Sequence, residues 1–208
     1  MDTRVRSRLS LLALLAAGAL LGAFQLAPAA IAANYRLGKN YGGDFTLTDH
    51  EGKAFSLRDA RGKVVLIHFG FTSCDSTCPA TMTKVSAALE KLGSRAASVQ
   101  PLLISVDTRR DTPAVLRDYV HKFHPAYVGL TGSKQQVEAV ARQYRAPIHV
   151  HAADGDGFYV ADHGSGLYLV ARDGMLADLV FFEASPDVIA KRVASLLDHR
   201  TEPKGGSR

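Results

Sequence analysis

The only two cysteines of the chain, Cys74 and Cys78, lie four positions apart. At the start of a helix, two thiols at this spacing face the same way and can bind one soft metal ion or form one disulfide. A purely structural disulfide would close a very short loop and remove little entropy from the unfolded chain. In a continuous helix, residues i and i+4 have α-carbons about 6 Å apart, at the wide end of the disulfide range. The pair therefore favours metal or redox chemistry.

The first 33 residues have the pattern of an export signal. Three arginines precede an uncharged stretch from residue 9 to residue 33. The stretch is long enough to span a bilayer, and its alanine-rich end offers cleavage sites, so residues 1–33 are a signal peptide or an N-terminal membrane anchor. We expect the domain on the periplasmic side of a bacterial inner membrane, anchored there or free in the periplasm after cleavage. An oxidising compartment makes a thiol pair prone to disulfide formation.

Length and composition indicate one globular domain. The chain has 208 residues, of which 47% are hydrophobic, and a formal net charge of +5. We expect a linker at residues 34–43, a folded domain at residues 44–199 and a flexible tail at residues 200–208. No basic run is interleaved with aromatic residues, so nucleic acid is not expected as a partner.

The order of predicted elements indicates an α/β fold. Residues 63–69 form a nearly unbroken apolar run that reads as a central strand, and the cysteines follow it directly. Residues 102–106 form a second such strand. Helices are predicted after the cysteines as far as Gly93, from Thr112, from Ser133 and from Pro186, with hairpins near residues 45–57 and 166–182. This predicts a thioredoxin-like fold with a mixed central sheet flanked by helices and an N-terminal β-hairpin extension.

The position of the thiols also has an electrostatic consequence. Amide groups at a helix N-terminus lower the pKa of a thiol and favour thiolate. A cysteine pair that opens a helix is therefore expected to be reactive.

Three motifs carry a resemblance to a known family. They are residues 69–72 leading into Cys74-x-x-x-Cys78-Pro79, residues 104–107 followed by residues 110–113, and Asp162-His163 before the strand at 167–170. With these motifs the chain resembles the SCO/SenC family, the copper-binding thioredoxin-like proteins of respiratory oxidase assembly, over residues 41–197. The resemblance implies that Cys74, Cys78 and His163 bind one copper ion per chain and that the cysteines also form a redox-active disulfide. Two thiolates and an imidazole suit Cu(I), and a further donor would accommodate Cu(II).

The residues around His163, the candidate third ligand, differ from those at the same place in other thioredoxin-like folds. In thioredoxin-like folds the loop before the last hairpin faces the thiols and usually contains a cis-proline, whereas this chain has Asp162-His163 and no proline there. Disulfide exchange with peptides would favour keeping that proline, so the histidine favours a metal site.

Several positions depart from the family pattern and leave the ligands intact. Ser73 stands where family members commonly have histidine. Asp75 and Thr108 stand where they commonly have proline, and Gly164 where they commonly have serine. They affect the groups that surround the ligands.

Carboxylates near the motifs have two interpretations. Asp107 and Asp162 are candidates to support a ligating histidine. The alternative for Asp107, Asp111 and Thr112 is that they cap the following helix, and for Asp111 we expect capping. Arg110 is a candidate to dock an acidic face of a partner.

The remaining histidines are expected to have ordinary roles. His149 and His151 are expected on an exposed strand, with a second, weaker metal site as the alternative. His121 and His124 are expected to be solvated on a helix. His68, within the first core strand, is expected to be half-buried and hydrogen-bonded.

The resemblance implies a copper chaperone that delivers copper to the dinuclear copper centre in subunit II of cytochrome c oxidase. A copper donor and a thiol reductant would be further partners. The alternative is a thiol-disulfide oxidoreductase that reduces the cysteines of the oxidase copper site, and the two roles can coexist. Whether the chain is an enzyme is left open. A peroxidase is disfavoured because Ser73 and Asp75 supply no positive charge, and a catalytic zinc site because nothing nearby activates a water.

Overall fold

The computed structural model describes residues 41–150, 161–163 and 166–199, although side chains at 149–150 and 161–163 are outside the description. The predicted signal peptide or anchor at residues 1–33, nearly all of the predicted linker and the predicted tail lie outside the described residues. Within the described part of the chain, no helix combines the length and the hydropathy needed to cross a bilayer.

The described residues form one seven-stranded mixed sheet, as predicted. The central strands β3, β4 and β5 are parallel, and the outer pairings are antiparallel. In spatial order the strands are β2 (Ala54–Ser56), β1 (Thr46–Asp49), β5 (Val128–Thr131), β4 (Val99–Ser105), β3 (Val64–Gly70), β8 (Leu167–Val170) and β9 (Leu176–Val180). A separate antiparallel pair joins β6 (Ile148–Val150) to β7 (Ala161–His163).

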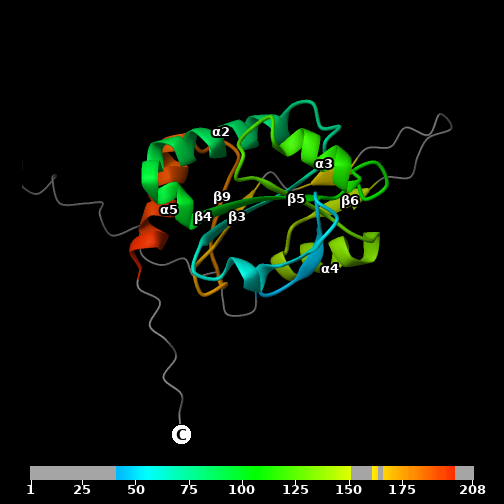
Figure 1. Ribbon diagram of the computed structural model, residues 1–208, viewed down its shortest axis with the longest axis horizontal. Coiled ribbons are helices and arrows are strands. Elements are labelled where there is room, and N and C mark those ends of the chain that lie inside the picture. Colours follow the sequence, from blue (N-terminus) through cyan, green and yellow to red (C-terminus); the bar gives the residue numbers. More distant parts are fainter. Residues whose placement is uncertain (1–40, 151–160, 164–165, 200–208) are drawn as a thin grey trace, which may run out of the picture. The chain divides into compact units, whose positions relative to one another are not determined.

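Helices cover both faces of the sheet (Figure 1). They are α2 (Thr77–Leu92), α3 (Pro113–Val120), α4 (Lys134–Tyr144) and α5 (Pro186–Asp198), with short 3₁₀ helices η1 (Leu57–Ala60) and η2 (Gly93–Ser98). Val64 and Leu66 of β3 pack with α2, α3 and α5, whereas Val65 and Ile67 pack with α4 and η1. Because successive side chains of a strand point to opposite faces, a strand buried on both faces is apolar throughout. All seven residues of β3 are buried.

The predicted N-terminal hairpin, β1 and β2, extends the main sheet because β1 pairs with β5. His50 follows β1 directly and is buried. Its Nδ1 accepts a hydrogen bond from the Gly129 backbone N–H at 3.0 Å. Its ring also meets the edge of the His121 ring, with centroids 5.2 Å apart. A neutral imidazole therefore helps to attach the hairpin to β5.

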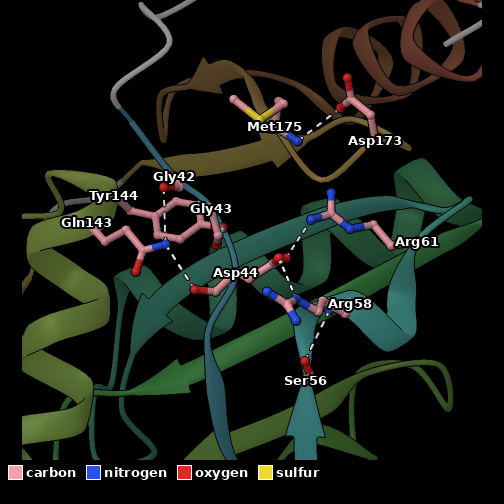
Figure 2. Close-up of polar contacts among 10 residues, drawn as sticks. All are labelled: Gly42, Gly43, Asp44, Ser56, Arg58, Arg61, Gln143, Tyr144, Asp173 and Met175. Carbon is pink, nitrogen blue, oxygen red and sulfur yellow. Dashed lines mark hydrogen bonds and ion pairs between the residues drawn. The ribbon is translucent and has the colours of Figure 1, made fainter. Parts of the chain in front are cut away.

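The entry of the chain into the domain is clamped against the end of α4 (Figure 2). The Gly42 N–H donates to the Gln143 carbonyl at 2.9 Å, and the Gln143 side-chain amide donates to the carbonyls of Gly42 and Asp44 at 3.1 and 3.2 Å. The Tyr144 hydroxyl donates to the Gly43 carbonyl at 3.0 Å. Gly42 and Gly43 both have positive φ, which glycine adopts without strain. The clamp therefore depends on the backbone freedom of this glycine pair.

Two ion pairs complete the clamp. The Asp44 carboxylate binds Arg58 at 2.8 Å and Arg61 at 2.6 Å, and the pKa of Asp44 is lowered, first by the hydrogen bond from Arg58. A Cβ on Gly42 would lie 2.8 Å from the Cβ of Leu176, the first residue of β9. Since β9 runs in the same direction as β3, the clamp lies at the end of the sheet opposite Gly70.

Removing the Tyr144 hydroxyl should weaken the clamp measurably. We expect Tyr144→Phe to lower the free energy of unfolding by about 1–2 kcal/mol, because it leaves a carbonyl without its donor. Urea unfolding followed by circular dichroism measures this. Tyr127→Phe is the matched control, since the buried Tyr127 hydroxyl has no hydrogen-bond partner among the described residues. Equal losses in the two variants would contradict the role of the clamp.

His50 should make folding stability depend on pH. Burial is the main cause that lowers its pKa from 6.5, followed by the charge of His121, against opposing effects of Asp49 and Glu51. The unfolded chain therefore takes up the proton first. Stability should be full above pH 6.5 and decrease as the pH falls toward the folded pKa, by at most about 1.4 kcal/mol per pH unit.

Urea unfolding at pH 7.5 and pH 5.5 tests this dependence. In His50→Asn, the amide oxygen replaces Nδ1 as acceptor without titrating, so the difference between the two pH values should shrink. His199→Asn, at the exposed end of α5, is the control. The His199 variant should lose stability on acidification as wild type does. The expectation fails if the His50 variant loses just as much.

Candidate thiol and metal site

The end of β3 brings the two cysteines together. Cys74 lies in the loop after β3, where its N–H donates to the Phe71 carbonyl at 3.2 Å. Cys78 is the second residue of α2, and its N–H donates to the Cys74 Sγ at 3.4 Å. The two cysteines are not joined by a disulfide. The pair was expected to open a helix: Cys78 lies in the first turn of α2, whereas Cys74 precedes α2 and the loop carries it to the helix end.

A glycine at the end of β3 makes room for the inner thiol. A Cβ on Gly70 would lie 2.7 Å from the Cys78 Sγ, 3.1 Å from the His68 Nε2 and 3.2 Å from the Leu103 Cδ1. Cys78 and His68 are both fully buried, so the expectation of a half-buried His68 was wrong. His68 and Gly70 share one face of β3, and the thiol packs over that face.

Burial dominates the acidity of the inner thiol. It raises the pKa of Cys78 well above its usual range, whereas a hydrogen bond from the Phe71 backbone lowers it and the neighbouring Cys74 and Asp111 raise it further. The helix N-terminus was expected to favour thiolate, and for Cys78 this was wrong because desolvation penalises the anion more than the amides stabilise it. Burial therefore favours the protonated form of the Cys78 thiol.

Asp111 connects the cysteine loop to the neighbouring strand. Its buried carboxylate accepts hydrogen bonds from the Thr72 N–H at 2.9 Å, the Thr72 hydroxyl at 2.6 Å and the Ser105 hydroxyl at 2.6 Å. The expected helix-capping role of Asp111 was wrong. Thr112 is the N-cap of α3, and its hydroxyl accepts from the Val115 N–H at 3.4 Å.

Asp107 lies just after β4 and is buried. Its carboxylate accepts from the Arg110 backbone N–H at 3.2 Å and pairs with the Arg110 guanidinium. The Arg110 side chain is about a third exposed, at 35%. Support of a metal ligand by Asp107 and docking by Arg110 stay predictions.

His163 and Asp162 lie in β7, where their backbones pair with Ile148 and His149 of β6. The side chains of His163, Asp162 and His149 are outside those described, and His151 lies entirely outside the described residues. Leu167 follows His163 by four residues and pairs with His68 near the end of β3. This separation keeps the His163 α-carbon within about 14 Å of the Leu167 α-carbon. Copper ligation by His163 stays a prediction.

Within the described part of the chain, other candidate ligands do not form a second metal site. Among the side chains described, no three of His, Cys, Asp or Glu are placed to hold a metal ion together. His121 and His124 were expected on a helix, but α3 ends at Val120 and both lie beyond it. The His124 Nδ1 accepts from the Ala126 N–H at 3.1 Å.

Sequence reasoning missed Gly70, Thr72 and Ser105 as parts of the site. The useful signal was that all three lie at the carboxyl ends of two adjacent parallel strands, where functional groups of open α/β sheets gather. The register confirms this placement, because Gly70 of β3 is paired with Ser105 of β4.

The fold and the site define a thioredoxin-like domain with a thiol pair at the end of its central strand. The sequence model of the SCO1/SenC family matches residues 33–198. The chain therefore belongs to the SCO1/SenC family.

Individual relatives agree with this assignment. An SCO2-like protein of Rickettsia felis is 37% identical over 149 residues, which cover 71% of this chain and 73% of the relative. The copper-bound structure of Bradyrhizobium japonicum ScoI has a TM-score of 0.70 at 35% identity, covering 76% of this chain and 99% of that one. A third structure is that of BsSco, described as a member of the Sco family of cytochrome c oxidase assembly proteins with a disulfide switch. It has a TM-score of 0.62 at 29% identity, covering 77% of this chain and 96% of that one.

Adding one methyl group at Gly70 should displace the inner thiol. We expect Gly70→Ala to destabilise the fold by about 1–3 kcal/mol through overpacking and to speed native-state alkylation of Cys78 by iodoacetamide, as read by mass spectrometry. Gly129→Ala is the matched control. Its added Cβ would lie 2.9 Å from the Cβ of Leu116 in α3, so it overpacks the core at a position away from the thiols. Similar Cys78 alkylation in both variants would mean that destabilisation alone exposes the thiol.

Proposed function

We propose that this chain is a copper chaperone that binds one copper ion through Cys74, Cys78 and His163. The observation that carries the proposal is the adjacency of the two thiols at the end of β3, with the Cys78 N–H 3.4 Å from the Cys74 Sγ. Two thiolates and one imidazole suit Cu(I), and Cu(II) is accommodated when another donor completes the site. The copper-bound relative from Bradyrhizobium japonicum supports the assignment.

The unequal burial of the thiols suggests how copper leaves. Cys78 is fully buried, whereas Cys74 is only partly buried. An acceptor thiolate would therefore approach copper from the side of Cys74, and Cys78 would release the ion last. The copper is cargo, transferred by exchange of thiolate ligands, and Cys78 recovers its proton when the ion departs.

The proposed recipient is the dinuclear copper centre in subunit II of cytochrome c oxidase, with a copper donor and a thiol reductant as further partners. Family membership supports this choice. We also propose that residues 1–33 export the domain to the periplasmic side of the bacterial inner membrane, with or without later cleavage. The clamp at Gly42 and Gly43 then holds the linker at the end of the sheet opposite Gly70, which leaves the thiol end available to a partner.

A second candidate function uses the same pair. As a thiol-disulfide oxidoreductase, the two thiols would reduce a disulfide of the oxidase copper site, each losing one electron and one proton as they form their own disulfide. The closeness of Cys74 and Cys78 and the disulfide switch described for BsSco support this candidate.

Copper titration of the reduced full-length chain tests the chaperone proposal. We expect one tightly bound ion in wild type, none in Cys74→Ser or Cys78→Ser, and an affinity lower by about tenfold or more in His163→Ala, since loss of a donor weakens a metal site at least as much as loss of an outer partner. His199→Ala is the control.

The variants also separate the two candidate functions. Wild-type affinity in His163→Ala would remove that histidine from the site. If His163→Ala in addition supports oxidase assembly while either cysteine variant does not, the reductase is favoured over the chaperone.

A further inference from the structure

Two carboxylates lie beside the thiol site, and they differ in their partners. Asp107 pairs with the guanidinium of Arg110. Asp111 is 1% exposed, and each hydrogen bond to its side chain among the described residues comes from an uncharged group of Thr72 or Ser105. A buried carboxylate with only neutral donors has a high desolvation cost. An asparagine could engage the same three groups at lower cost, so the negative charge itself calls for an explanation.

The contacts of Asp111 determine how the cysteine loop leaves β3. Thr72 is two residues before Cys74, and both its backbone N–H and its hydroxyl are held. Ser105 is the last residue of β4 and lies beside Gly70 in the sheet. The carboxylate thus joins the loop that carries Cys74 to the strand next to the glycine that accommodates Cys78.

The charge of Asp111 also reaches the site. Its carboxylate holds Thr72, two residues before Cys74, and Ser105, which is paired in the sheet with Gly70, the glycine on which Cys78 packs. With the same ligands, a Cu(II) site carries one more positive charge than a Cu(I) site. A nearby fixed anion in a poorly solvated environment stabilises the more positive form.

We propose that Asp111 is a positioning residue of the copper site, which orients the Cys74 loop and biases the site toward Cu(II) relative to Cu(I). The charge role rests on the proposed copper binding, whereas the loop role does not. Capping does not explain Asp111, because Thr112 caps α3.

Affinities for the two copper ions test the charge role. Kd values of the full chain for Cu(II) and Cu(I) are measured by competition with chelators, and their ratio cancels effects common to both ions. In Asp111→Asn the ratio of Kd for Cu(II) to Kd for Cu(I) should rise about tenfold, the scale expected for a partner outside the ligand set. Asp173→Asn, in the turn before β9, is the matched control and should keep the wild-type ratio. An unchanged ratio in Asp111→Asn would overturn the charge role.

Amide hydrogen exchange of the copper-free chain tests the loop role. Asp111→Ala should speed exchange at residues 72–74 about tenfold or more, whereas Asp111→Asn should leave it close to wild type because the amide oxygen still accepts. Unchanged exchange in Asp111→Ala would overturn the loop role.

A second variant separates the two roles without changing residue 111. Thr72→Val removes one hydroxyl partner and keeps the charge, so it should speed exchange at residues 72–74 and leave the Kd ratio at the wild-type value. A shifted ratio in this variant would overturn the charge role. Failure of wild type to bind copper would overturn the proposed function and the charge role together, and the exchange measurements would still decide the loop role.

Discussion

The close packing of Cys78 against Gly70 is the contact on which the site depends. The central strand β3 is buried along its whole length and ends at this glycine, where a Cβ would lie only 2.7 Å from the thiol sulfur. Because the strand cannot shift without disturbing the core on both faces, the sulfur has one position relative to the sheet. The loop that follows then has to bring Cys74 back to α2. The rigid core therefore fixes the position of Cys78, to which the loop then brings Cys74.

The two ends of the sheet hold different parts of the chain: the loops around the thiols at one end and the incoming N-terminal segment at the other. At the carboxyl ends of β3 and β4, buried carboxylates and hydroxyls organise the loops around the thiols, as expected where ligands of open α/β sheets gather. At the opposite end, the glycine pair Gly42 and Gly43 and the pair of arginines around Asp44 hold the incoming chain (Figure 2). Residues 42–44 are therefore held at the end of the sheet away from the two thiols.

Unequal burial gives the two thiols different chemistry. Burial raises the pKa of the inner thiol and so favours its protonated form. The outer thiol is only partly buried and is the more accessible of the two. A pair of this kind is compatible with copper transfer and with disulfide exchange, so both proposed functions use the same site. A donor such as His163 would favour the first of them.

Local patterns were sufficient for most of the architecture. The apolar run of β3, the spacing of apolar residues in α2 and the turn residues of the hairpins predict their elements because these patterns reflect burial on one or two faces. The sequence by itself also determined the family, through motifs whose order along the chain is specific. Only the tertiary structure decided that Asp111 holds Thr72 and Ser105 instead of capping α3, and that burial raises the pKa of Cys78. The physical reason is that these contacts join separate segments of the chain, such as Thr72 and Asp111, which lie 39 positions apart, and no local pattern brings such segments together.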